Sequence, residues 1–162
     1  MDLKRHNNLA RSREKQNKRF LNSLRKADAR RVDEAFHKLH EEVFGETSCL
    51  LCANCCKTTS PIFYQNDIER LSRLFRMRPA DFIEKYLRID EDNDYVLQSV
   101  PCTFLDADNY CSVYEARPKA CREYPHTNRK KMVRILDLTH KNTRVCPAVL
   151  EIVERLKNVS LH

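Results

Sequence analysis

Eight cysteines are the residues of this chain whose type and spacing are best suited to chemistry. Four of them, Cys49, Cys52, Cys55 and Cys56, lie within eight residues in a C-x2-C-x2-C-C arrangement. Gaps of two residues let a tight loop turn several sulfurs onto one centre, at the short metal–sulfur distances that zinc and iron require. Disulfides within so short a run would need strained geometry. The pattern therefore predicts metal ligation, with disulfides or buried, unligated thiols as alternatives.

The adjacent cysteines Cys55 and Cys56 are poorly placed to bind one ion together. Successive side chains point to opposite faces of an extended chain and lie about 100° apart in a helix. We expect one of the two to complete a site with Cys49 and Cys52, and the other to face a second site or the core. The remaining cysteines are Cys102, Cys111, Cys121 and Cys146. Eight thiolates suffice for two four-sulfur sites or one polynuclear cluster, and the sequence leaves their division open.

Basic residues flank one of the later cysteines. Arg117 and Arg122 lie on either side of Cys121. Positive charge lowers the pKa of a nearby thiol and offsets the negative charge of a thiolate-rich site. We therefore expect both arginines to balance charge near the metal. A reactive thiol would suit the same surroundings, but a catalytic cysteine needs a base, whereas this sequence supplies seven more sulfurs.

Longer stretches of the sequence resemble the YkgJ-like cysteine-cluster family of zinc- or iron-chelating domains. The shared pattern consists of the C-x2-C-x2-C-C run and the later segments Cys102–Leu105, Cys111–Pro118, Cys121–Pro125 and Cys146. The resemblance covers residues 49–150 and leaves out residues 1–48. Relatives usually carry glycine where this chain has Ala53, which calls into question any loop that needs a positive φ there.

The identity of the metal stays open between zinc and a [4Fe–4S] cluster. Cys49, Cys52 and Cys55 follow the first three positions of the bacterial ferredoxin run, and Cys146-Pro147 resembles its closing pair. A C-x2-C motif joined by distant cysteines is equally typical of structural zinc sites. The radical-SAM spacing C-x3-C-x2-C is absent from the sequence.

These features predict a small metal-binding module, and two other functions remain as alternatives. Flagellin lysine methylases look similar in their cysteine cluster, which would make this chain an iron–sulfur-dependent enzyme. Gly45 is the only glycine, however, so a glycine-rich nucleotide loop is hard to place, and whether the chain is an enzyme stays open. The other alternative is a metal-stabilised nucleic-acid-binding protein that uses the basic N-terminus.

The net charge of +7 is concentrated near the N-terminus. Residues 1–31 contain eleven Lys and Arg against three Asp and Glu, whereas residues 32–48 are acidic. Residues 1–31 are therefore the segment expected to contact a nucleic acid or an acidic protein, if either is a partner. No run is apolar enough for a membrane span and no secretory signal is recognised, so we expect a cytoplasmic protein.

The elements that position the cysteines are expected to be mostly helical. Residues 10–44 lack Pro and Gly and have apolar residues every three or four positions, which predicts one amphipathic helix that ends at Gly45. Shorter helices are expected at 66–75 (capped by Asn66 or Asp67), 79–87, 118–124 and 147–156, and strands at 95–97, 103–105, 110–114 and 132–136. The expected fold is mainly α with a small β-hairpin (α+β), with a helical extension at 1–48 and a cysteine-cluster domain at 49–162.

Overall fold

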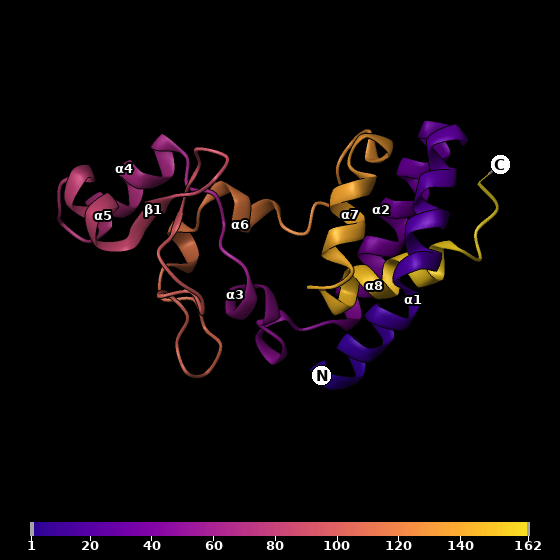
Figure 1. The fold of residues 1–162 in the computed structure, drawn as a ribbon, viewed down its shortest axis with the longest axis horizontal. Helices are drawn as coiled ribbons and strands as arrows, with labels where there is room; N and C mark the ends of the chain where they lie inside the picture. The colour runs from indigo at the N-terminus through magenta and orange to yellow at the C-terminus, as the bar shows by residue number, and fades with distance from the viewer. Residues whose placement is uncertain (1, 162) are drawn as a thin grey trace. The chain divides into compact units, whose positions relative to one another are not determined.

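The computed structural model describes residues 2–161, which divide between two compact units (Figure 1). The first unit contains Met1–Cys52 and Pro125–His162, and the second contains Ala53–Tyr124. Helices predominate and a two-stranded antiparallel sheet is present, so the expected α+β class is confirmed. The expected division into an extension at 1–48 and a cysteine-cluster domain at 49–162 is not tested by these units and stays a prediction. Within the described part, no helix combines the length and apolar character needed to cross a membrane.

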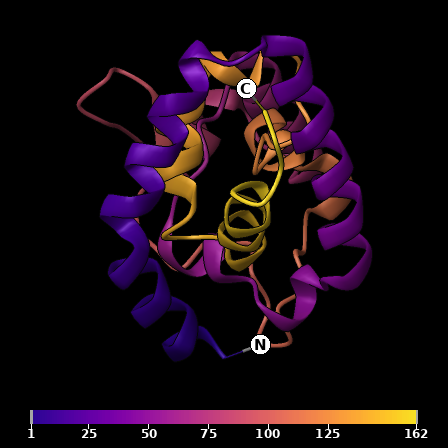
Figure 2. The same ribbon diagram turned by 90° about the vertical axis from the view of Figure 1, so that its right-hand side faces the viewer.

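The first unit is built from helices that come from both ends of the chain. They are α1 (Leu3–Ser23), α2 (Ala29–Glu46), α7 (Leu136–Asn142) and α8 (Pro147–Leu156). Figure 2 shows α8 between α1 and α2, and it contacts both. Short 3-10 turns lie at Leu24–Lys26, Cys49–Leu51 and Met132–Arg134.

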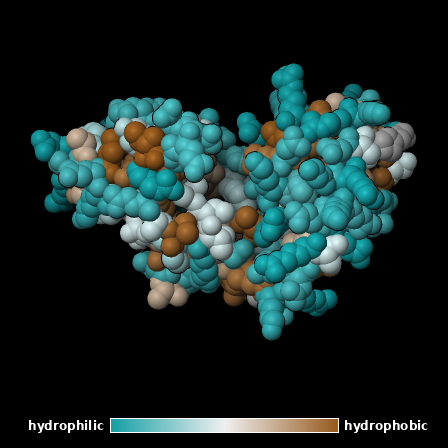
Figure 3. Space-filling view, viewed as in Figure 1, coloured by the Kyte–Doolittle hydropathy of each residue, from teal (hydrophilic) through white to brown (hydrophobic). Residues whose placement is uncertain are grey.

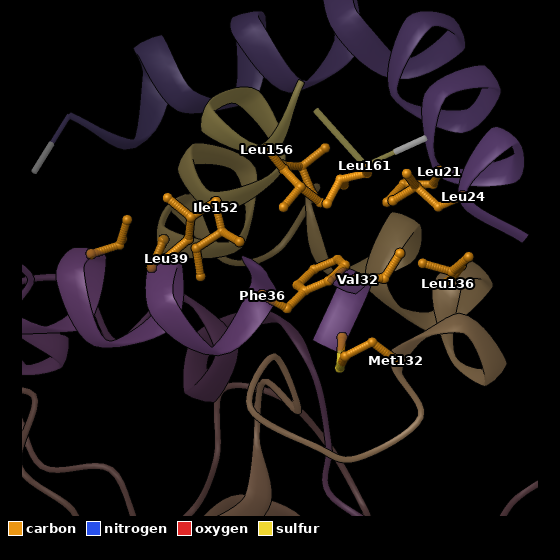
Figure 4. Packing of buried hydrophobic residues seen from close by; sticks show 13 residues of the cluster. Leu21, Leu24, Val32, Phe36, Leu39, Met132, Leu136, Ile152, Leu156 and Leu161 are labelled. Carbon is orange, nitrogen blue, oxygen red and sulfur yellow. The ribbon is translucent and has the colours of Figure 1, made fainter. Parts of the chain in front are cut away.

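Apolar side chains from these helices form one buried cluster. Phe36 of α2 and both Ile152 and Leu156 of α8 are fully buried in it (Figure 4). The cluster continues through Leu21, Leu24, Val32, Leu39, Met132, Leu136 and Leu161. Burying a side chain of this size contributes about 1.5–3 kcal/mol. The core therefore fixes the helices next to which Cys49, Cys52 and Cys146 lie.

The expected long N-terminal helix is confirmed over residues 3–26, but its continuation to residue 44 is wrong, because the helix ends before Asp28 and a second helix begins there. Ala27 is extended, and the Asp28 carboxylate accepts a hydrogen bond from the backbone N–H of Arg31 at 2.9 Å, which caps α2. An aspartate that satisfies a free N–H group starts a new helix better than it continues an old one. Gly45 is likewise not the expected left-handed helix end, since it lies inside α2, which continues to Glu46.

The expected strand at 132–136 is also wrong, because a carboxylate on α2 folds this segment into a turn. Asp33 accepts hydrogen bonds from the backbone N–H groups of Lys131 at 2.7 Å and of Met132 at 2.8 Å. An aspartate with two such bonds acts as a cap for the 3-10 turn that leads into α7. Met132 is fully buried as a result.

The second unit places short helices beside the two-stranded sheet. Its elements are α3 (Asn54–Thr58), α4 (Gln65–Leu74), α5 (Pro79–Tyr86), β1 (Leu87–Ile89), β2 (Tyr95–Leu97), a 3-10 turn at Tyr114–Ala116, and α6 (Lys119–Glu123). Leu87 pairs with Leu97 across the sheet. Aromatic rings 5.0–6.4 Å apart form much of the core: Phe63, Phe75, Phe82, Tyr86 and Phe104.

The hairpin expected from strands 103–105 and 110–114 is reduced to a single bridge between Leu105 and Cys111. The intervening turn is tight, since the backbone N–H of Asp106 donates to Tyr110 O at 2.8 Å and Asn109 has a positive φ of 67°. The real sheet pairs β1 with β2 instead. The helices predicted at 79–87, 118–124 and 147–156 correspond to α5, α6 and α8 within one residue at each end, and the strand predicted at 95–97 is β2.

Candidate metal centre

The eight cysteines divide between the two units. Cys49, Cys52 and Cys146 belong to the first unit, and the other five belong to the second: Cys55, Cys56, Cys102, Cys111 and Cys121. None of these thiols, all of which fall within the described residues, takes part in a disulfide bond. Cys49 is exposed, whereas the other seven are partly buried. The arrangement leaves every sulfur chemically available as a ligand.

Four cysteines of the second unit lie close enough to act on one another electrostatically. Burial raises the pKa of Cys121 to about 12, and the charges of Cys56, Cys102 and Cys111 contribute to the same shift. Burial also raises the pKa of Cys102 and of Cys111, with smaller contributions from neighbouring thiols. The backbone joins two of them directly, because the N–H of Cys102 donates to Cys56 O at 2.8 Å. We call Cys56, Cys102, Cys111 and Cys121 the four-cysteine group.

Cys56 is the thiol of this group that loses its proton most readily. A hydrogen bond from the Cys55 thiol, with the two Sγ atoms 4.0 Å apart, lowers the pKa of Cys56 to about 7 in spite of burial. The positive charges of Arg117 and Lys57 lower it further. A large fraction of Cys56 is therefore thiolate at neutral pH, which is the form that binds metals.

The two arginines predicted to balance charge lie differently with respect to this group. The charge of Arg117 lowers the pKa of Cys56, and it opposes the rise in pKa of Cys111 and Cys121. Its guanidinium lies over the ring of Tyr114, 3.5 Å from the ring centroid. Arg122 instead donates to the backbone oxygen of Arg117 at 3.0 Å. Arg117 thus acts on the thiols directly, and Arg122 supports the backbone that carries it.

The ion pair between Asp67 and Arg70 holds the start of α6, the helix that carries Cys121 of the four-cysteine group. The Asp67 side chain is 3% exposed and accepts hydrogen bonds from Arg70 Nη2 at 2.6 Å and from the backbone N–H of Lys119 at 3.1 Å. Arg70 also donates to Arg117 O at 2.8 Å. Lys119 begins α6, the helix that carries Cys121. The expectation that Asn66 or Asp67 caps the helix at 66–75 is wrong, because Tyr64 is the cap residue of α4 and Asp67 lies in its first turn. The bond from Lys119 was not predicted, since nothing local indicates a partner 52 residues away.

Ala53, the residue before α3, adopts the positive φ that its side chain was expected to disfavour. Its φ is 47° and its ψ is 21°, in the left-handed region, and it is 5% exposed. An L-residue in this region is strained by about 1–2 kcal/mol. The turn before Asn54 therefore forms although alanine, and not glycine, occupies the left-handed position.

The other three cysteines form a group in the first unit, which we call the three-cysteine group. Burial raises the pKa of Cys146 to about 11, and the charges of Cys49 and Cys52 contribute to this shift. Cys49 begins a 3-10 turn, and the backbone N–H of Cys52 donates to Cys49 O at 3.0 Å. Cys146 immediately precedes α8. Burial of the core thus brings together cysteines that are about a hundred residues apart in sequence.

The thiols of each group are neighbours but do not converge on a single point. Across residues 2–161, no three Cys, His, Asp or Glu side chains stand in positions to hold a metal ion. The donor sets nevertheless fit zinc or an iron–sulfur cluster, because both are bound by several thiolates from a partly buried site.

Comparison with known proteins accounts for the stretch that contains these groups. Residues 48–147 match the CxxCxxCC family, which is described as a putative zinc- or iron-chelating domain. The chain belongs to the CxxCxxCC family. All eight cysteines lie within the CxxCxxCC domain, and its description does not choose between zinc and iron. No curated protein and no solved structure gives a significant match.

The CxxCxxCC domain is folded together with helices that lie outside it. Residues of α1 and α2, such as Leu21 and Phe36, share a buried cluster with Met132 and Leu136, which lie inside residues 48–147. The three-cysteine group is therefore supported by a core to which the N-terminal helices contribute. Their removal would expose the apolar side of α8, so experiments on this group require the full chain.

Proposed function

We propose that the chain is a small metal-binding module whose two cysteine groups hold separate zinc ions or iron–sulfur centres. The supporting observation is the partition of the thiols: Cys121 responds to the charges of the four-cysteine group, whereas Cys146 responds to those of the three-cysteine group. Neighbouring thiols that raise one another's pKa cannot all ionise without a cation between them. A bound metal ion supplies that positive charge and takes thiolates as ligands.

The four-cysteine group has the ligand number that a closed site needs. Four thiolates complete a tetrahedral zinc site or hold one [4Fe–4S] cluster. Cys56 provides a thiolate at neutral pH, and the charge of Arg117 offsets part of the negative charge that four thiolates bring. Cys121, with its pKa raised to about 12, ionises only when a metal ion displaces its proton. Cys55, beside Cys56, is the one thiol outside both groups.

The three-cysteine group differs because a fourth ligand position is left to another donor. Structural zinc sites are almost always four-coordinate, and a three-ligand site is typical of centres that also bind water or a substrate. Its exposed thiol, Cys49, and its partly buried thiol, Cys146, differ in access to solvent. We infer that the four-cysteine group is the more stable of the two centres.

Metal content measured on variants tests the proposal. The full chain is purified anaerobically, zinc and iron are quantified, and a visible spectrum separates a colourless zinc protein from a brown iron–sulfur protein. Cys121→Ser and Cys146→Ser should each remove the metal of one group, and the double variant should remove both. Ser112→Ala is the control, because Ser112 is next to Cys111 and donates a hydrogen bond to Phe104 O but carries no sulfur.

Two results would contradict the proposal. A wild-type protein that holds neither zinc nor iron would refute metal binding. A Cys121→Ser variant that loses all metal, while remaining folded by circular dichroism, would show one shared centre instead of two.

A further inference from the structure

One face of α1 carries basic side chains that all point away from the core. Each helical residue turns by about 100°, so residues separated by three, four or seven positions lie in one row. Such a row contains Lys4, Arg11, Lys15 and Lys18, and it is flanked by Arg5 and Arg19. All six are exposed, whereas the opposite side of the helix buries Ala10, Asn17 and Leu21. At about 1.5 Å per residue the face extends for roughly 22 Å.

Acidic residues do not neutralise this face. Among the described residues, none of its six basic side chains takes part in an ion pair. Glu14 is the acidic residue within α1, and it lies off the face and pairs with Arg144 at 3.4 Å. The carboxylate of Asp2, just before the helix, accepts a hydrogen bond from the backbone N–H of Arg5. The face therefore presents six uncompensated positive charges.

The surroundings of these charges disfavour a protein or a membrane as the partner. Protein interfaces have an apolar core and are depleted in lysine, and a membrane-surface helix must keep an apolar face free for lipid. The apolar side of α1 is already buried against the core, with Leu9 as the most exposed exception at 39%. In the view of Figure 3, hydrophilic residues cover most of the surface over α1.

The same face lacks what a single-stranded nucleic acid requires. Proteins that bind single strands stack bases on exposed aromatic rings. Phe20 is the aromatic residue of α1, and it packs against the buried cluster of the first unit. A duplex backbone, in contrast, needs only Lys and Arg with short polar side chains between them. Asn8 and Asn22 supply such side chains on the exposed side of the helix.

We propose that this basic face of α1 binds the phosphate backbone of a nucleic-acid duplex without reading its sequence. The shallow depression at the start of the face is lined by Asp2 as well as by Lys4, Arg5 and Asn8, so the phosphate contacts are assigned to the row that runs further along the helix. If the row of four basic residues contacts four phosphates, the logarithm of the binding constant falls against the logarithm of the salt concentration with a slope of about −3.6.

The test measures binding of the full chain to a labelled DNA duplex of about two helical turns, by fluorescence anisotropy over a range of KCl concentrations. Lys15→Gln combined with Lys18→Gln removes two phosphate contacts and keeps good helix formers. Affinity should fall about 60-fold at 0.1 M salt, and the slope should become shallower by about 2. The control, Arg73→Gln with Arg88→Gln, removes the same charge from exposed, unpaired positions of the second unit and should leave affinity within about twofold.

Several outcomes would overturn the inference. These are a wild-type salt slope shallower than about −2, or a control variant that loses as much affinity as the double lysine variant. Polyglutamate that competes as well as unlabelled duplex would indicate an acidic protein, and equal binding to anionic lipid vesicles would indicate a membrane. The variants should retain the metal content of the wild type, so a failure of the metal proposal would be seen separately.

Discussion

The buried carboxylate of Asp67 is the place where one substitution should disturb the four-cysteine group without removing a sulfur. Asp67→Ala takes away the acceptor for Arg70 Nη2 and for the backbone N–H groups of Tyr64 and Lys119. Two of these bonds hold the start of α6 and the arginine that contacts the Arg117 backbone. The variant should therefore lower both the stability of the second unit and its affinity for metal.

The loss of stability in Asp67→Ala follows from the Arg70 guanidinium and the two backbone N–H groups that lose their acceptor. Removing one member of a fully buried ion pair costs about 3–5 kcal/mol. The Arg70 side chain is 30% exposed, so it regains some water, and this part of the loss shrinks to about 1–2 kcal/mol. Each of the two backbone N–H groups adds about 1 kcal/mol if no water replaces the carboxylate. We expect Asp67→Ala to lower the free energy of unfolding by about 3 kcal/mol.

A surface pair of the same chemistry provides the matched control. Asp81 pairs with Arg78 at 2.8 Å, also three residues away, but its side chain is 43% exposed. Asp81→Ala should cost at most about 1 kcal/mol. Urea unfolding measures both variants, and competition with a chromophoric chelator measures their metal affinity. The reasoning is refuted if Asp67→Ala costs no more than Asp81→Ala, or if it unfolds more easily yet holds metal as tightly as the wild type.

Three further substitutions test other parts of the structure. Asn17 is fully buried, and neither polar atom of its side-chain amide is hydrogen-bonded. In urea unfolding, Asn17→Leu should therefore stabilise the protein by about 1–2 kcal/mol more than the exposed control Asn8→Leu. Equal effects of the two substitutions would contradict this. Burial lowers the pKa of His6, so the folded state binds fewer protons than the unfolded chain and the free energy of unfolding falls as pH drops below about 6.5. His6→Gln should flatten that decline by up to about 1.4 kcal/mol per pH unit. An unchanged pH profile of stability would exclude His6 as its source. Arg117→Gln should weaken metal binding in chelator competition more than Arg122→Gln does, because the Arg117 charge is the one that lowers the thiol pKa values; the reverse order would count against it.

The parts of the fold that the sequence predicts well are those with a local signal. Pro79 and Pro147 mark the first turns of α5 and α8, where a missing N–H group is harmless and the fixed φ suits a helix. The cysteine spacing has a local basis too, since it depends on reach along a few residues, but the ligand loop that it indicates stays a prediction. Asp28 had a local signal too, but the lack of Pro and Gly in that region argued for a continuous helix.

The parts that the sequence does not predict depend on contacts between distant segments. Asp33 accepts hydrogen bonds from backbone N–H groups about a hundred residues away, and these bonds fold the segment at Lys131 into the turn before α7. Division of the cysteines into two groups has the same origin, because packing of the first unit places Cys146 near Cys49, 97 residues away in sequence. Residue types and their spacing along the chain do not indicate contacts between distant segments. They therefore identify the candidate ligands but do not assign each ligand to a site.

Ala53 adopts the left-handed conformation that the side chain of alanine disfavours, and the fold tolerates it. The left-handed conformation costs alanine about 1–2 kcal/mol relative to an unstrained residue. Its methyl group is almost fully buried, which returns about 0.8 kcal/mol, and alanine has less backbone entropy than glycine to lose on folding, which returns about 0.4–1 kcal/mol. The opposing contributions are of similar size, so glycine has no large advantage at this position. The turn before α3 therefore depends on the conformation that the surrounding structure imposes, and a sequence rule that equates positive φ with glycine underestimates that influence.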